Sequence, residues 1–476
     1  MTIRLRMGRR QLVDYSILLL ITMAAVWIRI PKLDSYISTD DGIYAASCWL
    51  MKLGYRPYVD FTLVQPPLFY WIVLALWNIT NLSDPFQLWT LAKLVSLTSF
   101  IANTFLIYLT CNRRLGNPNA GLVGALIYQF SYDSYNYSVS SCPQVLATLF
   151  MVAAVYMLLS DGRTTRHFLL TGICLGLAAI TRFSAFLLIP AFLAYLLWQI
   201  RKGRVTREMA AFAAIGLLIP LLSLLTVPFD ALKRDLIVYH ATKSVTPTPI
   251  QVSVTGLVGD FTTKEPPNLL GSISLIYTLS KRDQKHTVVS GAAVFLLMTY
   301  LAQPVLTSQH LIESIPFFSI IAALGLTGFT VSIDKESRRK MIVMTICLIL
   351  VALYFVPENV YYGKRALGAH SFNHVLKRLV DSTQRYSNSD EMVFSQVSVI
   401  PFLAGRRCPP IADIDWVNLE MGLFTAENVM QLVQNYPLKV VVITHRTEME
   451  TRDFLERTGY TRVERIDMYR VYVKGV

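Results

Sequence analysis

Apolar residues gather into long runs along the chain, and short polar or basic stretches separate these runs. Most runs are about 17–24 residues long, which is the length that crosses a bilayer as an α-helix. The pattern therefore predicts a mostly α-helical protein, a polytopic membrane helix bundle with about eleven crossings. We expect the crossings at residues 12–31, 87–110, 115–131, 143–160, 167–183, 184–200, 209–228, 267–280, 287–305, 310–331 and 341–356.

The composition agrees with this pattern and narrows the function. Of the 476 residues, 53% are hydrophobic and 16% are charged, whereas an ordinary soluble chain carries about 25% charged residues. The net charge of +13 comes largely from basic residues in short loops, which is typical of the cytoplasmic side of a membrane protein. The positive charge therefore does not indicate binding to nucleic acid. The first apolar run lacks a small-residue cleavage site, so we expect a retained first helix and a cytoplasmic N-terminus.

The short basic loops also constrain the topology. They lie at residues 113–114, 163–166, 201–207, 281–285 and 335–340. If all of them are cytoplasmic, only one of the two apolar stretches between residues 40 and 113 can cross the membrane. The shorter stretch, 66–78, is expected to lie at the outer interface. The alternative is a full crossing there, which would place residues 113–114 outside.

The apolar runs end at residue 356, so residues 1–356 are expected to form the transmembrane domain. Residues 357–476 are predicted to form a small soluble α/β domain on the extracytoplasmic side. The sequence of this part contains no glycine-rich phosphate loop, so nucleotide binding is not indicated there. We expect helices at 371–386, 426–435 and 448–458, and strands at 391–395, 439–444 and 465–473.

Two adjacent carboxylates, Asp40 and Asp41, follow the first membrane helix in a long external stretch, residues 32–86. Charge at the mouth of a membrane helix is costly, so the pair is a candidate functional site. A carboxylate there can accept a proton from a hydroxyl nucleophile, and a pair can hold a divalent metal ion. The alternative is that both residues only cap the following helix as solvated charges.

Three motifs in this stretch resemble the first external loop of the C-class glycosyltransferases, in particular the protein O-mannosyltransferase and lipid A aminoarabinose transferase group. They are Asp40-Asp41-Gly42-Ile43-Tyr44, Pro57-Tyr58-Val59-Asp60-Phe61 and Gln65-Pro66-Pro67-Leu68-Phe69-Tyr70-Trp71. Segments 176–182 and 309–316 are similar to later segments of the family, although more weakly. The resemblance implies transfer of a sugar, hexosyl or pentosyl, from a polyprenyl-phosphate carrier to an acceptor hydroxyl on the outer face of the cell membrane. It implies that Asp40 is the catalytic base and that Asp41 occupies the second acidic position.

The resemblance and the expected topology together suggest which residues meet the donor. Arg182 would lie at the outer end of its helix, where a guanidinium could bind the phosphate; the alternative is an interfacial arginine that snorkels. Further phosphate candidates are Lys233, Arg234, His240 and Lys243, or else these form a plain basic interfacial stretch. Candidates to line the cavity are Gln65, Tyr70, Asp133 and His310. Asp133 could instead be a solvated loop charge, and His310 an ordinary interfacial histidine.

The chain also departs from the family pattern. The acidic pair is Asp-Asp rather than Asp-Glu, Gln65 stands where several relatives have lysine, and Gln144 stands where many relatives have an acidic residue. These departures leave dependence on a divalent metal open. The acceptor could be a lipid, a glycan or a protein. Two other functions stay open as well: a transporter or lipid flippase, and a protein that binds a lipid-linked sugar without turnover. A transporter would not explain the long outer loop or the external domain.

Overall fold

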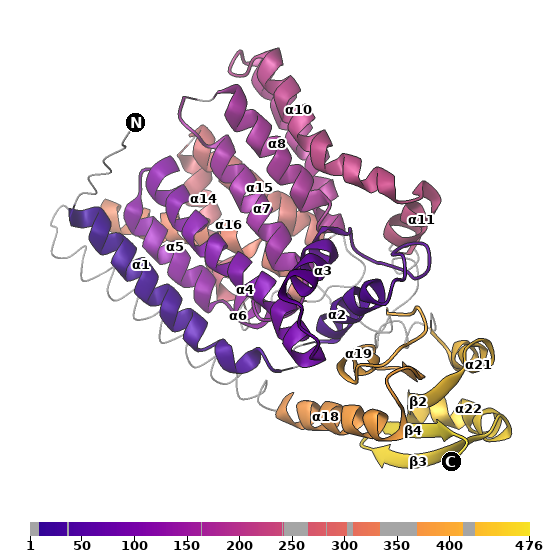
Figure 1. Cartoon of the computed structure of the whole chain (residues 1–476). Coiled ribbons are helices and arrows are strands. Elements are labelled where there is room, and N and C mark those ends of the chain that lie inside the picture. The colour runs from indigo at the N-terminus through magenta and orange to yellow at the C-terminus, as the bar shows by residue number, and fades with distance from the viewer. Residues whose placement is uncertain are drawn as a thin grey trace.

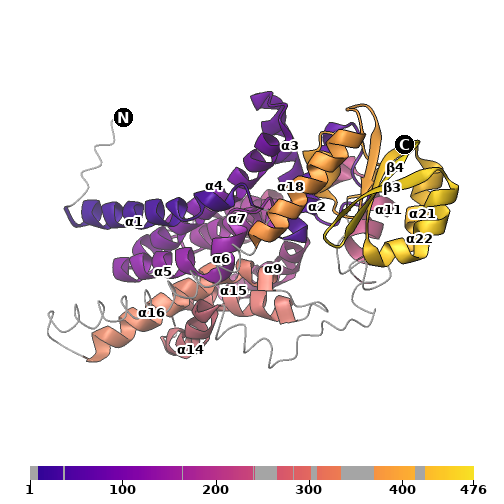
Figure 2. The ribbon, with the colours of Figure 1, turned by 90° about the horizontal axis from the view of Figure 1, so that it is seen from below.

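The computed structural model describes residues 9–35, 38–162, 164–239, 241, 265–281, 283–301, 308–333, 369–412 and 424–476. A bundle of helices makes up the larger part, and a small α/β domain packs against one end of it (Figures 1 and 2). The predicted fold class, a mostly α-helical bundle with a C-terminal α/β domain, is confirmed. The predicted boundary between the domains, at residues 356 and 357, lies outside the described residues.

Each predicted crossing in the described part of the chain coincides with a helix. Among these residues, four helical stretches are long and apolar enough to cross a membrane by length and composition: Arg10–Lys32, Pro85–Arg114, Phe183–Arg201 and Arg207–Thr226. The predicted crossing at 341–356 lies outside the described residues. The helices of the bundle are α1 Arg9–Trp27, α4 Pro85–Leu109, α5 Pro118–Phe130, α7 Pro143–Leu158, α8 Thr165–Ala179, α9 Leu188–Arg201, α10 Arg207–Leu221, α14 Pro266–Ser280, α15 Gln284–Leu301 and α16 Ile315–Ile333.

Three of the basic loops that were predicted to share one side of the membrane meet in the structure, beside Asp161, which precedes the loop at 163–166. The Lys285 Nζ lies 2.6 Å from an Asp161 carboxylate oxygen and donates a hydrogen bond of 2.8 Å to the Arg114 carbonyl. Nearby, Arg204 donates to the Gln284 side chain at 3.2 Å. These contacts gather the loops at the end of the bundle opposite the C-terminal domain (Figure 1).

Helices α8 and α10 pack with their backbones in close contact. A Cβ atom on Gly172 of α8 would lie 2.1 Å from the carbonyl oxygen of Ala213, and one on Gly216 of α10 would lie 2.2 Å from that of Leu169. Glycine is therefore needed on both helices, as is common where membrane helices pack closely. The contact fixes α8, whose C-terminal end leads into Arg182.

The first external stretch forms two helices, α2 (Thr39–Lys52) and α3 (Leu68–Thr80), which lie beside each other at the end of the bundle that carries the C-terminal domain (Figures 1 and 2). Helix α3 contains most of the stretch 66–78 that was predicted to lie at the outer interface. A third short helix, α6 (Tyr132–Tyr137), lies in the connection between α5 and α7.

The C-terminal domain is a four-stranded sheet with helices on both faces. Its strand order is β1-β2-β4-β3, with β1 parallel to β2 and the other pairs antiparallel. Its described elements are α18 Ala369–Tyr386, β1 Met392–Ser395, α19 Val399–Leu403, α21 Ala426–Asn435, β2 Leu438–Thr444, α22 His445–Arg457, β3 Tyr460–Ile466 and β4 Tyr469–Lys474. The expected alternation of helix and strand is confirmed, but the single strand expected at 465–473 is wrong. The chain turns at Asp467, which has a φ of 52°, and forms a hairpin from β3 and β4. Aspartate adopts this left-handed conformation more readily than most residues.

The two faces of the sheet belong to two different hydrophobic cores. Phe394 and Val441 pack with α21 and α22 in a core that lies within the C-terminal domain. Val393 and Val440, one position earlier on each strand, point to the opposite face. There they join α18 and α19 in a core that continues into the first external stretch of the membrane domain.

Glu448 of α22 holds this helix on the sheet. Its buried carboxylate accepts hydrogen bonds from the Tyr472 hydroxyl at 2.8 Å, from Arg470 Nε at 3.0 Å and from Arg462 at 3.0 Å. His445, at the start of the same helix, lies 3.1 Å away. Burial alone would raise the pKa of Glu448, but the hydrogen bonds and positive charges outweigh it and lower the pKa to about 2. The charged form is therefore the one that stabilises the fold.

Acid should weaken this domain in a defined range of pH. Because the pKa of Glu448 is lower in the folded state than the ordinary value of 4.5, its contribution is fully present above about pH 4.5 and is lost as the pH falls toward 2. The thermal midpoint of the full chain, followed by circular dichroism from pH 7 to pH 2, should show this loss. The variant Glu448→Gln should lack this loss of stability between about pH 4.5 and pH 2. The variant Glu450→Gln, at an exposed position on the same helix, should behave like the wild type. Identical pH profiles for all three proteins would contradict the assignment.

Candidate active site

The acidic pair lies in the first turn of α2. Ser38 is the N-cap, and its side chain accepts a hydrogen bond from the backbone N–H of Asp41. Carboxylates are favourable at a helix N-terminus because of the exposed N–H groups and the helix dipole. The two residues differ in exposure: Asp40 is partly exposed, and Asp41 is completely buried.

Asp41 is at the centre of a buried polar network. Its carboxylate lies 3.2 Å from the ammonium of Lys93 and accepts hydrogen bonds from Trp89 Nε1 at 3.2 Å and from the Ser141 N–H at 2.8 Å. The Ser141 hydroxyl also donates to the Asp41 backbone carbonyl at 2.7 Å. Lys93 is itself fully buried and lies 3.7 Å from the centre of the Trp89 ring. Asp41 thus joins α2 to α4 and to the segment that precedes α7.

Asp40 lies close to the connection between α5 and α7, residues 131–142. The Tyr137 hydroxyl has a pKa well above the usual value, first because it is buried and then because the charges of Asp133 and Asp40 act on it. Burial raises the pKa of the Cys142 thiol to about 12; Arg182 opposes this effect, and both Asp41 and Asp40 add to it. Because such charge effects weaken with distance, Asp40 and Arg182 both lie near the segment from Asp133 to Cys142.

Arg182 follows α8 and is almost completely buried. Its guanidinium pairs with Glu313, and its Nε donates to the Ser184 hydroxyl at 3.0 Å. Ser184 in turn lies 2.8 and 2.9 Å from the two Glu313 carboxylate oxygens. The buried Nη1 of Arg182 has no hydrogen-bond partner among the described residues. Because buried polar atoms are nearly always hydrogen-bonded, this nitrogen can take a further acceptor such as a phosphate oxygen.

The segment Gln65-Pro66-Pro67 packs against the connection between α8 and α9 that contains Arg182. The Gln65 side chain accepts a hydrogen bond of 3.2 Å from the backbone N–H of Phe183, directly after Arg182. The N–H of Leu68 donates to the carbonyl of Ile180 at 3.0 Å. Gln65 therefore lies beside Arg182 in the folded chain. Tyr70 is buried and packs edge-on against Tyr44 of α2, with ring centres 6.1 Å apart.

The basic stretch after residue 229 contacts the first external loop. Arg234 donates to the Tyr58 carbonyl at 2.7 Å and pairs with Asp235 at 2.6 Å. The other Asp235 oxygen accepts the N–H of Leu63 at 3.0 Å. Arg234 therefore holds this loop, and a phosphate-binding role predicted for it would compete with these contacts. Lys233 is exposed.

Of the four other candidates, two lie in the described part of the chain. Asp133 is buried on α6, and its N–H bonds to the Glu265 carboxylate. His310 lies in a short 3-10 helix, Ser308–Glu313, three residues before Glu313. His240 and Lys243 lie outside the described residues.

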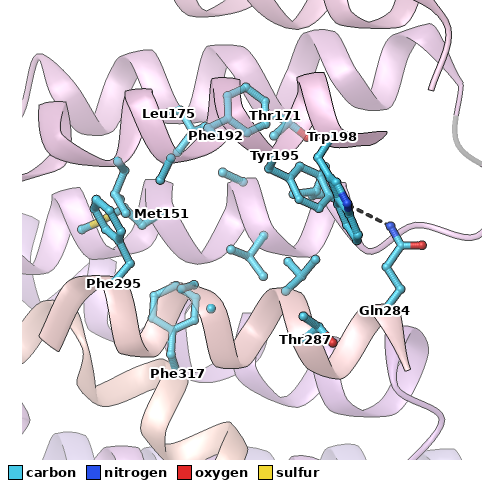
Figure 3. A pocket seen from close by; sticks show the side chains of 18 of the residues that line it. Met151, Thr171, Leu175, Phe192, Tyr195, Trp198, Gln284, Thr287, Phe295 and Phe317 are labelled. Atoms are coloured by element: carbon cyan, nitrogen blue, oxygen red, sulfur yellow. Dashed lines mark hydrogen bonds between the residues drawn. The ribbon is translucent and has the colours of Figure 1, made fainter. Parts of the chain in front are cut away.

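A groove lies between α7, α8, α9, α15 and α16, and its cavity volume is about 860 Å³. Figure 3 shows Phe192 and Tyr195 of α9 on one side of it and Phe295 and Thr287 of α15 on the other. At one end it is lined by Leu188, six residues after Arg182, and by Phe317, four residues after Glu313; Lys202 and Arg204 line the other end. One end of the mostly apolar groove therefore follows the Arg182 and Glu313 pair by a few residues along the chain, although neither Arg182 nor Glu313 lines it.

The sequence reasoning missed several of these residues. Lys93 and Glu313 are charged residues within or next to apolar runs, and that position alone marks a functional or structural role. Ser141 and Asp235 carry no such signal, because their importance depends on contacts with residues about 100 and 172 positions away.

The described residues do not form a metal site. No three His, Cys, Asp or Glu side chains among them are arranged to hold a metal ion. In addition, the Asp41 carboxylate is already neutralised by Lys93. The donor set at the acidic pair therefore does not fit a divalent metal held by Asp41.

Comparisons with known proteins agree with this geometry. Residues 64–226 match the sequence profile of a family described as dolichyl-phosphate-mannose-protein mannosyltransferase. No curated protein matches the sequence. Among solved structures, ArnT from Cupriavidus metallidurans is similar both in the apo state (TM-score 0.68, 11% identity) and bound to undecaprenyl phosphate (TM-score 0.64, 10% identity), and each match covers 97% of both chains.

A second group of similar structures comes from an archaeon. The oligosaccharyltransferase AglB of Archaeoglobus fulgidus, in complex with an inhibitory peptide and a dolichol-phosphate, matches with a TM-score of 0.61 and 11% identity, over 98% of this chain and 75% of the other. At such low identity these likenesses concern the fold. The chain is a multi-pass membrane protein with the C-class glycosyltransferase fold, and its predicted resemblance to the protein O-mannosyltransferase and aminoarabinose transferase group is confirmed.

Proposed function

We propose that this protein is a glycosyltransferase that moves a sugar from a polyprenyl-phosphate carrier to an acceptor hydroxyl. The proposal rests on the difference in exposure between the two aspartates of the acidic pair. Asp40 is partly exposed, whereas Asp41 is fully engaged by Lys93, Trp89 and Ser141. Asp40 can therefore meet a substrate, and Asp41 keeps the start of α2 in place.

The proposed reaction is a direct displacement at the anomeric carbon. Asp40 accepts the proton of the acceptor hydroxyl while the oxygen forms its bond to that carbon. The bond between the anomeric carbon and the phosphate oxygen breaks, and the electron pair leaves with polyprenyl phosphate. Positive charge near the departing oxygen stabilises the developing negative charge. Arg182 is the residue that we assign to this role, because its Nη1 has no hydrogen-bond partner in the described part of the chain.

The groove supports a lipid-linked donor. A polyprenyl phosphate has an anionic head and a long apolar tail; the groove has a mostly apolar lining, and one end of it, at Leu188, comes six residues after the buried Arg182. Helix α9, which runs along the groove, has 14 residues, so the groove is about 20 Å long. ArnT is known bound to undecaprenyl phosphate and AglB bound to a dolichol-phosphate, and we extend that donor class to this chain. The sugar and the acceptor, whether lipid, glycan or protein, stay open.

The orientation in the membrane is part of the proposal. The loops that meet around Lys285 are basic, and basic loops favour the cytoplasmic side. This assigns the N-terminus to the cytoplasm, and the acidic pair and the C-terminal domain to the outer face of the cell membrane.

The substitution Asp40→Asn should abolish the base without altering its size. We expect sugar transfer from a panel of polyprenyl-phosphate sugars to fall by about 10²–10⁴-fold, with the protein still inserted and folded. The matched control is Asp84→Asn, an exposed N-cap of α4, where asparagine caps equally well. Full transfer by Asp40→Asn would refute Asp40 as the base. Absence of a glycosylated product with wild-type protein would favour a transporter, a flippase or a lipid-sugar binding protein.

The substitution Lys93→Met should destabilise the protein, because it leaves the buried Asp41 carboxylate without a cation. Breaking a buried ion pair costs about 3–5 kcal/mol, which we expect as a lower thermal midpoint in detergent. The double variant Asp41→Asn with Lys93→Met should regain much of that loss. Lys52→Met, at an exposed position of α2, is the control. Equal midpoints for Lys93→Met and Lys52→Met would contradict the network.

Removal of the Arg182 charge should weaken donor binding. Since Arg182→Gln alone would leave Glu313 buried and unpaired, the informative variant combines Arg182→Gln with Glu313→Gln. Hydrogen bonds to charged groups contribute about 1.5–3 kcal/mol, so the KM for the donor should rise by about 10- to 100-fold. Arg201→Gln, exposed at the end of α9 away from Arg182, should leave the KM unchanged. An unchanged KM in the double variant would remove Arg182 from the phosphate site.

A further inference from the structure

The C-terminal domain and the first external stretch share one hydrophobic core. This core contains α2 residues from Ile43 to Leu50, the buried side of α3, and the sheet face of the C-terminal domain that carries α18 and α19. The domain has a second core on its other sheet face. One side of the C-terminal domain is therefore completed by the helix that carries the acidic pair.

Phe402 of α19 is the residue at the centre of this contact. Its side chain is fully buried. Its ring stacks on Trp77 of α3, with ring centres 5.4 Å apart and an interplanar angle of 21°, and also lies 5.4 Å from the Trp49 ring of α2. Aromatic pairs at such distances add favourable energy beyond the burial of apolar area. Phe402 therefore fills the space between helices α2 and α3.

Polar contacts fix the orientation of α2 in the same interface. Trp49 Nε1 donates to the carbonyl of Arg406 at 3.0 Å, and the Tyr55 hydroxyl donates to the carbonyl of Cys408 at 3.3 Å. These carbonyls are presented by a turn at Gly405, which has a φ of 66° and so suits glycine. The Arg406 side chain holds the turn by donating to the Ser387 carbonyl at 2.7 Å and to the Ser387 hydroxyl at 3.0 Å.

Helix α2 is thus held at both ends by different parts of the protein. The network of Asp41 fixes its first turn, and Phe402 and the Arg406 carbonyl fix Trp49. Trp49 lies nine residues after Asp40, which is about two and a half turns. A shift at Trp49 therefore moves Asp40 as well, because a short helix moves as a rigid rod.

We propose that the C-terminal domain positions the catalytic helix, and that Phe402 is a positioning residue for Asp40. The inference rests on the proposed function, since it assigns Phe402 an effect on sugar transfer that acts only through α2. Displacement of a catalytic group by about 1 Å can lower a rate by about 100-fold. Truncation of Phe402 should therefore lower kcat, while donor binding at Arg182, which follows α8, is kept.

The test compares two equal substitutions in the full-length protein. Phe402→Leu removes the ring between Trp49 and Trp77. Phe394→Leu removes an equally buried ring, which stacks on Phe424 in the other core of the same domain. We expect Phe402→Leu to lower kcat by about 10- to 100-fold with an unchanged donor KM, and Phe394→Leu to keep the wild-type kcat. Trp49→Phe, which keeps a ring but loses the donor to the Arg406 carbonyl, should lower kcat in the same direction.

Hydrogen exchange gives a readout that does not depend on catalysis. In Phe402→Leu the backbone amides of α2 should exchange faster than in the wild type, whereas in Phe394→Leu they should not. Equal losses of kcat in the two variants, a raised donor KM in Phe402→Leu, or unchanged exchange in α2 would overturn the proposal. If the wild-type protein transfers no sugar, the proposed function fails, and the exchange comparison alone still decides whether the domain positions α2.

Discussion

The ion pair of Asp41 and Lys93 is the interaction on which the arrangement of the site depends. Both side chains are fully buried, and a buried charge is tolerated only when a counter-charge and hydrogen bonds compensate it. The carboxylate meets that condition with groups from α4 and from the segment before α7, so three segments must come together before the pair is stable. The cost of burying one acid thereby fixes the place of its neighbour, Asp40, which stays partly exposed.

Arg182 and Glu313 form a second buried ion pair, which differs from the first in how completely its polar atoms are hydrogen-bonded. Glu313 shares its carboxylate with Ser184, while one nitrogen of Arg182 is without a partner among the described residues. The guanidinium is therefore charge-compensated but not fully hydrogen-bonded. Such a site can exist without a ligand and still offers donors to an anion. Along the chain, Arg182 precedes the groove residue Leu188 by six positions, and Glu313 precedes the groove residue Phe317 by four.

The sequence predicted features whose signal is local. Apolar runs revealed the membrane helices, and adjacent charges at a helix mouth revealed the acidic pair. It could not reveal partners that meet only in the folded protein, such as Ser141 for Asp41 or Asp235 for the loop at Leu63. The turn at Asp467 was missed because no glycine marks it, and one expected strand became two. Arg234 was named as a candidate for binding phosphate or as part of a plain basic interfacial stretch. The structure adds contacts with Tyr58 and Asp235 that hold a loop, a role that charge alone does not reveal.

The contact between Trp49 and the Arg406 carbonyl spans 357 positions of the chain, and this has a consequence for biogenesis. Trp49 leaves the ribosome long before its partner is synthesised, and contacts between such distant residues form slowly because a long loop must close first. The first external stretch must therefore wait, with an incomplete core, until the last part of the chain has reached the same side of the membrane. Helix α2, which carries the acidic pair, is consequently among the last parts of the protein to mature.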